Sequence, residues 1–171
     1  STLNVCPILP ANGPILRALE LPEIYAITQA EALGMDVFRC KLGEALERGL
    51  KLIQVREKNL PSDALRQFAV YVVALAHRHG ARVLINGDVR LACDVGADGV
   101  HLSAATLRTL TERPACEWVA ASCHDRAEIE AATRLGADFV VTGPVMTTPT
   151  HPGMPALGWN GFVTCVQDTS V

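Results

Sequence analysis

Three polar side chains with the chemistry of an anion site stand two residues apart, at Gln54, Arg56 and Lys58. In an extended strand alternate side chains share a face, so we expect these three on one face and Val55 on the other, against helices. An arginine fork and a lysine ammonium beside an amide suit a phosphate or a pyrophosphate. Taken alone, the segment is more simply interpreted as a solvated charged turn.

The apolar runs that follow also end in polar side chains. The runs that begin at residues 82, 99 and 118 each end in this way, and a last apolar run leads into residues 143–150. Because the carboxyl ends of parallel strands line one rim of a barrel, polar groups gathered there are more typical of a ligand site than of chance. The residues are Asn86, Asp88, His101, Ser103, Ser122 and His124, of which His101 is interpreted as structural.

These side chains need a parallel sheet to bring them together, and the chain carries the pattern of one. From Glu23 onward, short runs rich in Val, Ile and Ala alternate with segments of helical period, as in a sheet wrapped by helices. The expected strands are residues 24–28, 50–56, 82–86, 99–102, 118–123 and 139–145. The expected helices are residues 37–48, 62–79, 89–95, 126–135 and 159–167, and Ser62 is the expected N-cap of the second.

A short internal echo accompanies this alternation. The tripeptide Gly-Ala-Asp occurs at residues 96–98 and again at 136–138, each time between an expected helix and the next strand. Glycine can adopt the left-handed conformation that ends a helix, after which the chain returns to the sheet. We interpret the echo as structural punctuation without a catalytic role.

Six βα units predict an α/β fold of the TIM type, a (β/α) barrel that is incomplete because a closed one has eight. We expect further residues or a partner chain to complete it, since open sheet edges favour aggregation. Four prolines within residues 1–22 disfavour a regular element before Ile15 and predict a linker or the tail of an upstream domain. The barrel domain is expected over residues 23–171.

Composition narrows the classes of function. The formal net charge is −3, and no run of Lys or Arg offers a surface for nucleic acid or an anionic membrane. No apolar run approaches the ~20 residues of a membrane span. Six scattered cysteines without metal-site spacing predict reduced, mostly buried thiols. We therefore expect a cytoplasmic protein. The cationic strand end described above predicts small phosphorylated molecules as partners, and a homo-oligomer is a further expectation.

Several of these segments, taken in order, resemble thiamine phosphate synthase and its thiazole tautomerase relatives over residues 23–161. The matching segments are QVREK at 54–58, IN at 85–86, GADGVHL at 96–102, SCH at 122–124 and GPVMTTPT at 143–150. The resemblance implies an enzyme of thiamine biosynthesis, a transferase. Its reaction joins hydroxymethylpyrimidine diphosphate to a thiazole phosphate, with magnesium and with loss of pyrophosphate.

The resemblance also implies roles for individual residues. Cationic and amide donors would hold the diphosphate, and hydroxyls would hold the thiazole phosphate. The implied diphosphate group consists of Gln54, Arg56, Lys58, Asn86, Ser122 and His151, the last in place of a family lysine. The implied ligands of the thiazole phosphate are Thr148 and Thr150.

The chain departs from the family where magnesium is bound. After Asn86 the family has an aspartate, and here the residue is Gly87, with Asp88 one position further on as a candidate ligand. A second family carboxylate is replaced by Thr106. Magnesium prefers charged oxygen ligands, so we expect metal-assisted synthase chemistry to be impaired in this chain.

Two alternatives stay open beside the synthase interpretation. In the tautomerase branch of the resemblance, a histidine at the position of His124 shifts a proton on the thiazole phosphate, as one general acid–base residue can. The segment before Leu21 also resembles the junction in fusions of a Nudix hydrolase with such a barrel. The chain would then be the C-terminal domain of a larger protein. The second alternative is that this domain is not catalytic and binds a thiamine-related phosphate or stabilises the attached hydrolase.

Overall fold

The computed structural model describes residues 8–10, 21–143 and 158–167, which belong to two compact units. The first unit contains residues 22–101 and 116–118. The second contains the other described residues. None of the helices within the described ranges combines the length and the apolar character that a membrane crossing requires.

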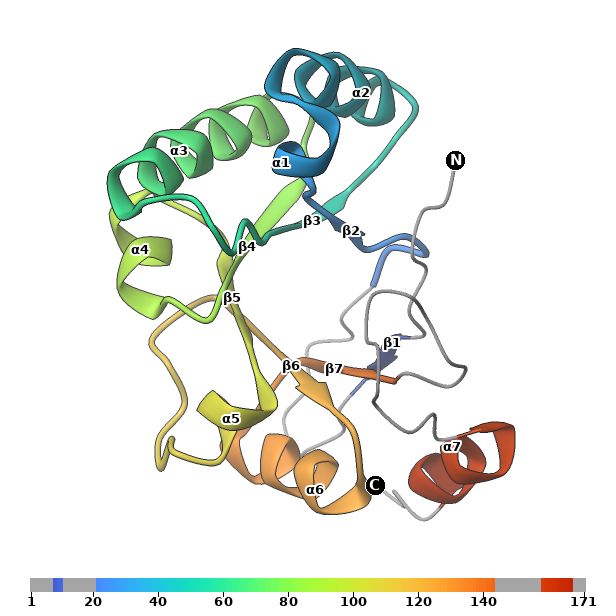
Figure 1. Ribbon diagram of the computed structural model, residues 1–171. Helices are drawn as coiled ribbons and strands as arrows, with labels where there is room; N and C mark the ends of the chain where they lie inside the picture. Colours follow the sequence, from blue (N-terminus) through green and yellow to red (C-terminus); the bar gives the residue numbers. More distant parts are fainter. Residues whose placement is uncertain (1–7, 11–20, 144–157, 168–171) are drawn as a thin grey trace. The chain divides into compact units, whose positions relative to one another are not determined.

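Four parallel strands and four helices alternate in the first unit (Figure 1). The strands are β2 (Ala26–Ile27), β3 (Leu52–Val55), β4 (Arg82–Asn86) and β5 (Gly99–Leu102), hydrogen-bonded in that order. The helices are α1 (Ala30–Leu33), α2 (Met35–Glu47), α3 (Ser62–Arg78) and α4 (Val89–Asp94). Each parallel step thus returns through a helix, as the alternation of the sequence predicts.

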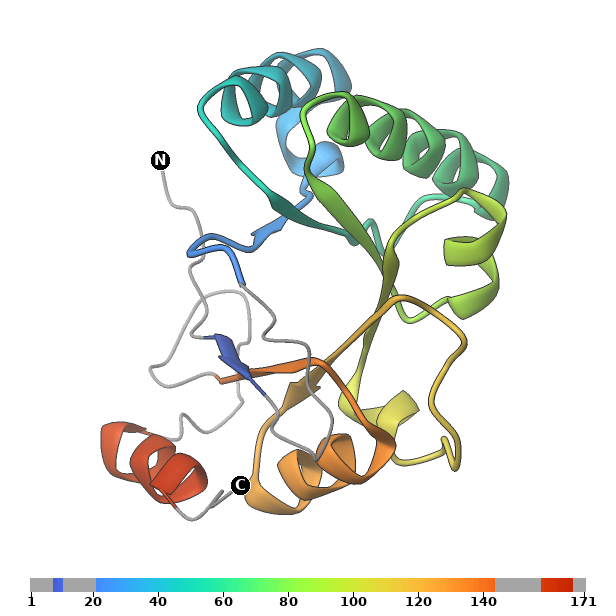
Figure 2. The same cartoon turned by 180° about the vertical axis from the view of Figure 1, so that it is seen from behind.

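The helices of the first unit lie on one face of its strands (Figure 2). The buried core of this unit lies between the strands and these helices. Alternate strand residues enter it, among them Val55 and Ile85, and they pack with buried side chains of α2 and α3 such as Phe38 and Phe68. Gln54 has the opposite parity and does not belong to this cluster. The prediction that Val55 faces the helices is confirmed.

The second unit contains two parallel strands and one antiparallel strand. Its elements are β1 (Ile8–Pro10), α5 (Ala104–Leu107), most of β6 (Trp118–Cys123), α6 (Arg126–Leu135), β7 (Phe139–Thr142) and α7 (Gly158–Gln167). Strand β7 pairs in parallel with β6 and antiparallel with β1. The expectation of no regular element before Ile15 is therefore wrong. Pro10 is compatible with β1 because β1 is an edge strand of the sheet.

Most expected elements are present, and the differences concern their ends. The strands β4, β5 and β6 and the helix α6 have the predicted bounds, whereas β2 and β3 are shorter than predicted. The four-residue helices α1 and α5 were not predicted, since four residues carry too little periodicity. Ser62 is not the N-cap of α3: Pro61 stands at that position, and Ser62 is the first helical residue.

The Gly-Ala-Asp echo is a structural repeat in which the aspartate also binds the backbone of a neighbouring strand. Asp98 donates its N–H to the carbonyl of Val83 at 2.9 Å, and its carboxylate accepts the Val83 N–H at 2.7 Å. Asp138 makes the same pair of bonds with Val119, at 2.7 and 2.6 Å. The echo therefore ends a helix and also holds the beginning of the neighbouring strand in register.

Candidate functional site

The carboxyl end of β3 carries two cations whose acidic neighbour is engaged elsewhere. Glu57, only 7% exposed, turns to α1 and accepts the first two backbone N–H groups of that helix, at 2.8 and 3.3 Å. The backbone N–H of Arg56 donates to the hydroxyl of Thr28 at 3.0 Å. Neither Arg56 nor Lys58 forms an ion pair within the part of the chain that the structure describes. Arg56 and Lys58 are therefore not neutralised by ion pairs with described residues, and the choice between an anion site and a solvated charged turn stays a prediction.

Asn86 lies beside this cationic end. The parallel ladder pairs Val55 with Ile85, so the next residues, Arg56 and Asn86, stand next to each other where β3 and β4 end. Both side chains are half-buried. A guanidinium and an amide at one strand end can together donate to an anionic oxygen.

Gln54 belongs to a buried hydrogen-bonded chain in the first unit. Its amide Nε2 donates to the phenol oxygen of Tyr25 at 3.3 Å, and that oxygen lies 3.1 Å from Nδ1 of His101. All three side chains are almost completely buried. Burial, together with the charge of Arg56, lowers the pKa of His101 to about 3, and burial raises the pKa of Tyr25. The hydrogen-bonded group of Gln54, Tyr25 and His101 is therefore uncharged at neutral pH.

The structural interpretation of His101 agrees with this arrangement. Tyr25, in contrast, is absent from the predicted site residues. A tyrosine in an expected strand was the available signal, because a buried tyrosine hydroxyl requires a hydrogen-bond partner. Which partner it takes, 76 residues away, was not accessible from local patterns.

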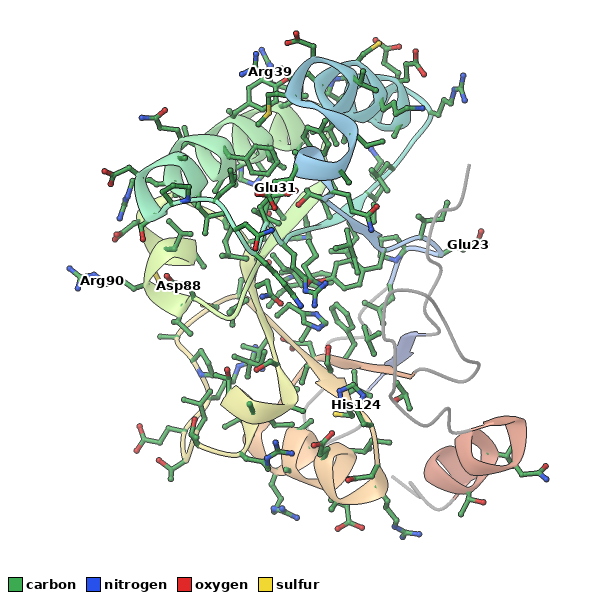
Figure 3. All side chains as sticks on the ribbon, viewed as in Figure 1. Glu23, Glu31, Arg39, Asp88, Arg90 and His124 are labelled. Carbon is green, nitrogen blue, oxygen red and sulfur yellow. The ribbon has the colours of Figure 1, made fainter. Side chains whose placement is uncertain are left out.

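Gly87 and Asp88, the two positions considered for a magnesium ligand, lie in the turn after β4. Gly87 has a positive φ of 74° and donates its N–H to the carbonyl of His101 at 2.8 Å. Asp88 lies at the beginning of α4 (Figure 3), where its Oδ1 accepts the Leu91 N–H at 2.8 Å. Asp88 is thus the N-cap of α4.

The described residues do not fit a magnesium site. Thr106 is also part of a helix start, because its hydroxyl lies 2.9 Å from that of the N-cap Ser103. Gly87 offers no side-chain oxygen, and one carboxylate oxygen of Asp88 is engaged in capping. No group of three His, Cys, Asp or Glu side chains within the described ranges could hold a metal ion.

His124, in the second unit, is held in one tautomer at the end of β6 (Figure 3). Its Nδ1 lies 2.6 Å from the carbonyl oxygen of Gly143, which can only accept, so Nδ1 carries the proton and donates it. In the neutral ring Nε2 is then the proton acceptor. Ser122 stands two residues earlier on β6, half-buried and with the same strand parity.

Cys123 does not take part in this chemistry. It is buried, and burial together with the charges of Glu128 and Asp125 raises the pKa of its thiol to about 12. The thiol is therefore protonated at neutral pH and unsuited to act as a nucleophile beside His124. The broader expectation of mostly buried thiols is wrong for Cys40 and Cys93, which are exposed.

The predicted site residues gather in two sets. Gln54, Arg56 and Asn86 lie at or near the carboxyl ends of β3 and β4, with exposed Lys58 two residues beyond Arg56. Ser122 and His124 lie at the carboxyl end of β6. That the two sets share one mouth stays a prediction. The remaining predicted residues, Thr148, Thr150 and His151, lie outside the described residues.

The alternation of parallel strands and helices, with polar side chains at the strand ends, defines an α/β protein of the barrel class. Residues 24–171 match the family described as thiamine monophosphate synthase (TMP-TENI). The chain belongs to this family, and it is thus a thiamine monophosphate synthase-like domain.

Individual relatives agree with the family. A relative from Geobacter sulfurreducens is 39% identical over 130 residues, which are 74% of this chain and 61% of the relative. The thiamine-phosphate synthase of Thioalkalivibrio sulfidiphilus is 35% identical over 148 residues, 83% of this chain and 67% of that protein. The chain thus spans about two thirds of the length of these relatives.

A solved structure supports the fold. The thiamine phosphate pyrophosphorylase from Pyrococcus furiosus superposes with a TM-score of 0.66 at 27% identity, over 84% of this chain and 69% of that one. The protein has four parallel strands in the first unit and two in the second. Together with this likeness, these strands confirm the predicted fold class, an incomplete (β/α) barrel of the TIM type.

Proposed function

We propose that this domain binds a phosphorylated thiamine precursor at the carboxyl ends of β3 and β4. The observation that carries the proposal is the orientation of Glu57. Its buried carboxylate accepts hydrogen bonds from the start of α1 and forms no ion pair with Arg56 or Lys58. Two adjacent cations beside the amide of Asn86 attract a diphosphate more strongly than a neutral group.

The ligand class follows from the charge distribution. Hydroxymethylpyrimidine diphosphate has an anionic end for Arg56 and Lys58, and its uncharged ring requires no charged partner. Thiazole phosphate is the second proposed ligand, with Thr148 and Thr150 as its phosphate ligands, while His151 is a further proposed ligand of the diphosphate. Ser122 is proposed to contact the leaving pyrophosphate.

The same proposal includes impaired synthase chemistry. Departure of pyrophosphate in this family's reaction is assisted by magnesium, and the described residues lack the carboxylates for that ion, since Gly87 and Thr106 replace them. The chain's own contribution is to bind and orient the diphosphate through its cations.

Isothermal titration with hydroxymethylpyrimidine diphosphate, thiazole phosphate and pyrophosphate tests the binding. Arg56→Gln and Lys58→Gln should each weaken diphosphate binding about tenfold or more, because a charge-assisted hydrogen bond contributes about 1.5–3 kcal/mol. Lys41→Gln is the matched control, since Lys41 is an exposed cation on α2. Equal affinities of all three variants would refute the site. Magnesium-dependent product formation by the wild type would refute the impaired synthase step.

A second candidate function, thiazole tautomerase, is favoured by the tautomer of His124. With Nδ1–H bound to Gly143, the ring presents Nε2 as a base, which is what a proton shift on a thiazole phosphate requires. A tautomerase assay with wild type and His124→Ala tests this. Activity that survives the substitution would exclude the role, since general acid–base catalysis contributes about 10²–10⁴-fold.

The remaining predictions become outcomes of the same experiments. Binding of a thiamine precursor without either activity would favour the non-catalytic domain attached to a Nudix hydrolase. The attached hydrolase, a homo-oligomer and a cytoplasmic location are parts of this proposal.

A further inference from the structure

The carboxylate of Glu128 joins the backbone of His124 to the side chain of Arg108. Its Oε2 accepts the His124 N–H at 2.8 Å, and its Oε1 accepts from Nη1 of Arg108 at 2.5 Å. The side chain of Glu128 is only 7% exposed, whereas that of Arg108 is 62% exposed. A buried carboxylate is thus neutralised by a cation that reaches it from the surface.

The position of Glu128 in α6 makes this bond unusual. Asp125 is the N-cap of α6, and its carboxylate accepts the Glu128 N–H at 2.8 Å, as one half of a capping box does. In the other half of a capping box, the glutamate accepts the N–H of the N-cap residue itself. Here it reaches one residue further, to His124. The bond therefore restrains the histidine and not the cap.

His124 is consequently restrained from two sides. Its backbone is tied to α6 through Glu128, and its ring is tied to the carbonyl of Gly143, the residue that follows β7. Both bonds lie within the second unit. If the turn between β6 and α6 shifted, the 2.6 Å contact between Nδ1 and the carbonyl would be lost with it.

We propose that Glu128, with Arg108 as its counter-ion, is a positioning residue that keeps His124 in the Nδ1–H tautomer. The pair fixes the backbone of the turn, the turn places the ring against Gly143, and Nε2 is left as the atom that accepts a proton. The catalytic consequence rests on the proposed tautomerase function, whereas the effect on the ring does not.

Nitrogen-15 NMR of the His124 ring tests the proposal directly, because the two tautomers have different ring shifts. Glu128→Gln keeps the size of the side chain and removes its charge, and Arg108→Gln removes the counter-ion at an exposed position where folding is least at risk. Both should change the ring from one tautomer to a mixture. The His124 amide should exchange about tenfold faster or more, as expected for loss of a charge-assisted hydrogen bond.

Glu130→Gln is the matched control. Glu130 lies on the same helix and forms an exposed i,i+4 ion pair with Arg126. It should leave the His124 ring and amide signals unchanged. Ring signals that are identical in wild type, Glu128→Gln and Arg108→Gln would overturn the proposal.

Kinetics separate this inference from the proposed activity. If the wild type is a tautomerase, both variants should lower kcat about tenfold with little change in KM, since the substrate contacts are intact. If the wild type lacks the activity while the ring tautomer still depends on Glu128, the proposed function fails and the positioning role stands. Reduced kcat with an unchanged ring tautomer would assign the effect to another cause and refute the positioning role.

Discussion

The carboxylate of Asp138 accepts the backbone N–H of Val119 at 2.6 Å, while the Asp138 N–H donates to the carbonyl of the same valine at 2.7 Å. One residue thereby satisfies both backbone groups of Val119 at the beginning of β6. Arg113 neutralises the carboxylate at 2.8 Å. The same clamp at Asp98 and Val83 shows that a repeated tripeptide encodes a repeated contact.

Removal of this clamp should destabilise the fold. Asp138→Ala leaves the buried Val119 N–H without its side-chain acceptor, which should lower the free energy of unfolding by about 1–3 kcal/mol. Urea denaturation measures the change. Glu112→Ala, an exposed acidic residue, is the control and should be close to neutral. Equal stabilities of the two variants would contradict the clamp.

Thr142 offers a stabilising substitution. Its hydroxyl is completely buried and has no hydrogen-bond partner among the described residues. Thr142→Val replaces the hydroxyl with a methyl group of similar size and should raise the free energy of unfolding by about 1 kcal/mol. Thr28→Val is the matched opposite, because the Thr28 hydroxyl accepts the Arg56 N–H, and it should destabilise. Thermal melts that change in the same direction would refute this reasoning.

Gly99 and Trp118 approach each other too closely for a side chain. A Cβ at residue 99 would lie 1.9 Å from the backbone oxygen of Trp118, so Gly99→Ala must displace the neighbouring strand. The expected loss is about 1–3 kcal/mol or more, as for overpacking of a core. Gly43→Ala, in α2 with open space around it, should instead stabilise by about 0.5–1 kcal/mol. Tolerance of Gly99→Ala would disprove the close approach.

Stability should fall as the pH drops below the unfolded pKa of histidine. His101 has a folded pKa of about 3, so between that value and the unfolded pKa of about 6.5 the unfolded chain binds more protons than the folded one. This site should contribute a loss of about 2 kcal/mol between pH 6.5 and pH 5. The urea midpoint should therefore depend less on pH in His101→Gln than in the wild type across this range. Slopes that are equal in both proteins would contradict a neutral, buried His101.

The cysteines should differ in reactivity according to exposure and pKa. Cys40 and Cys93 are exposed and should be alkylated by iodoacetamide in the native protein. Cys123 is buried, with a pKa raised to about 12, and should react only after denaturation. Peptide mass spectrometry reads out each site. Native labelling of Cys123 at the rate of Cys40 would show that β6 opens readily.

Local patterns were sufficient for the elements and for the parity of the strands. Alternation placed Val55 among the helices and Gln54 on the opposite side, because side chains along a strand alternate whatever the rest of the fold does. Helical period identified α3 and α6, and the Gly-Ala-Asp echo located the ends of helices. The ordered strand-end motifs also identified the family, and the match over residues 24–171 confirms it.

Only the tertiary structure decided which groups meet. The partner of Glu57 is the beginning of α1, the partner of Tyr25 is 76 residues away, and the tautomer of His124 depends on Gly143. The pairing of Ile8 with Val141 could not be read from a proline-rich segment either. These contacts join residues far apart in the chain, and their energies depend on burial and distance, which no local spacing contains.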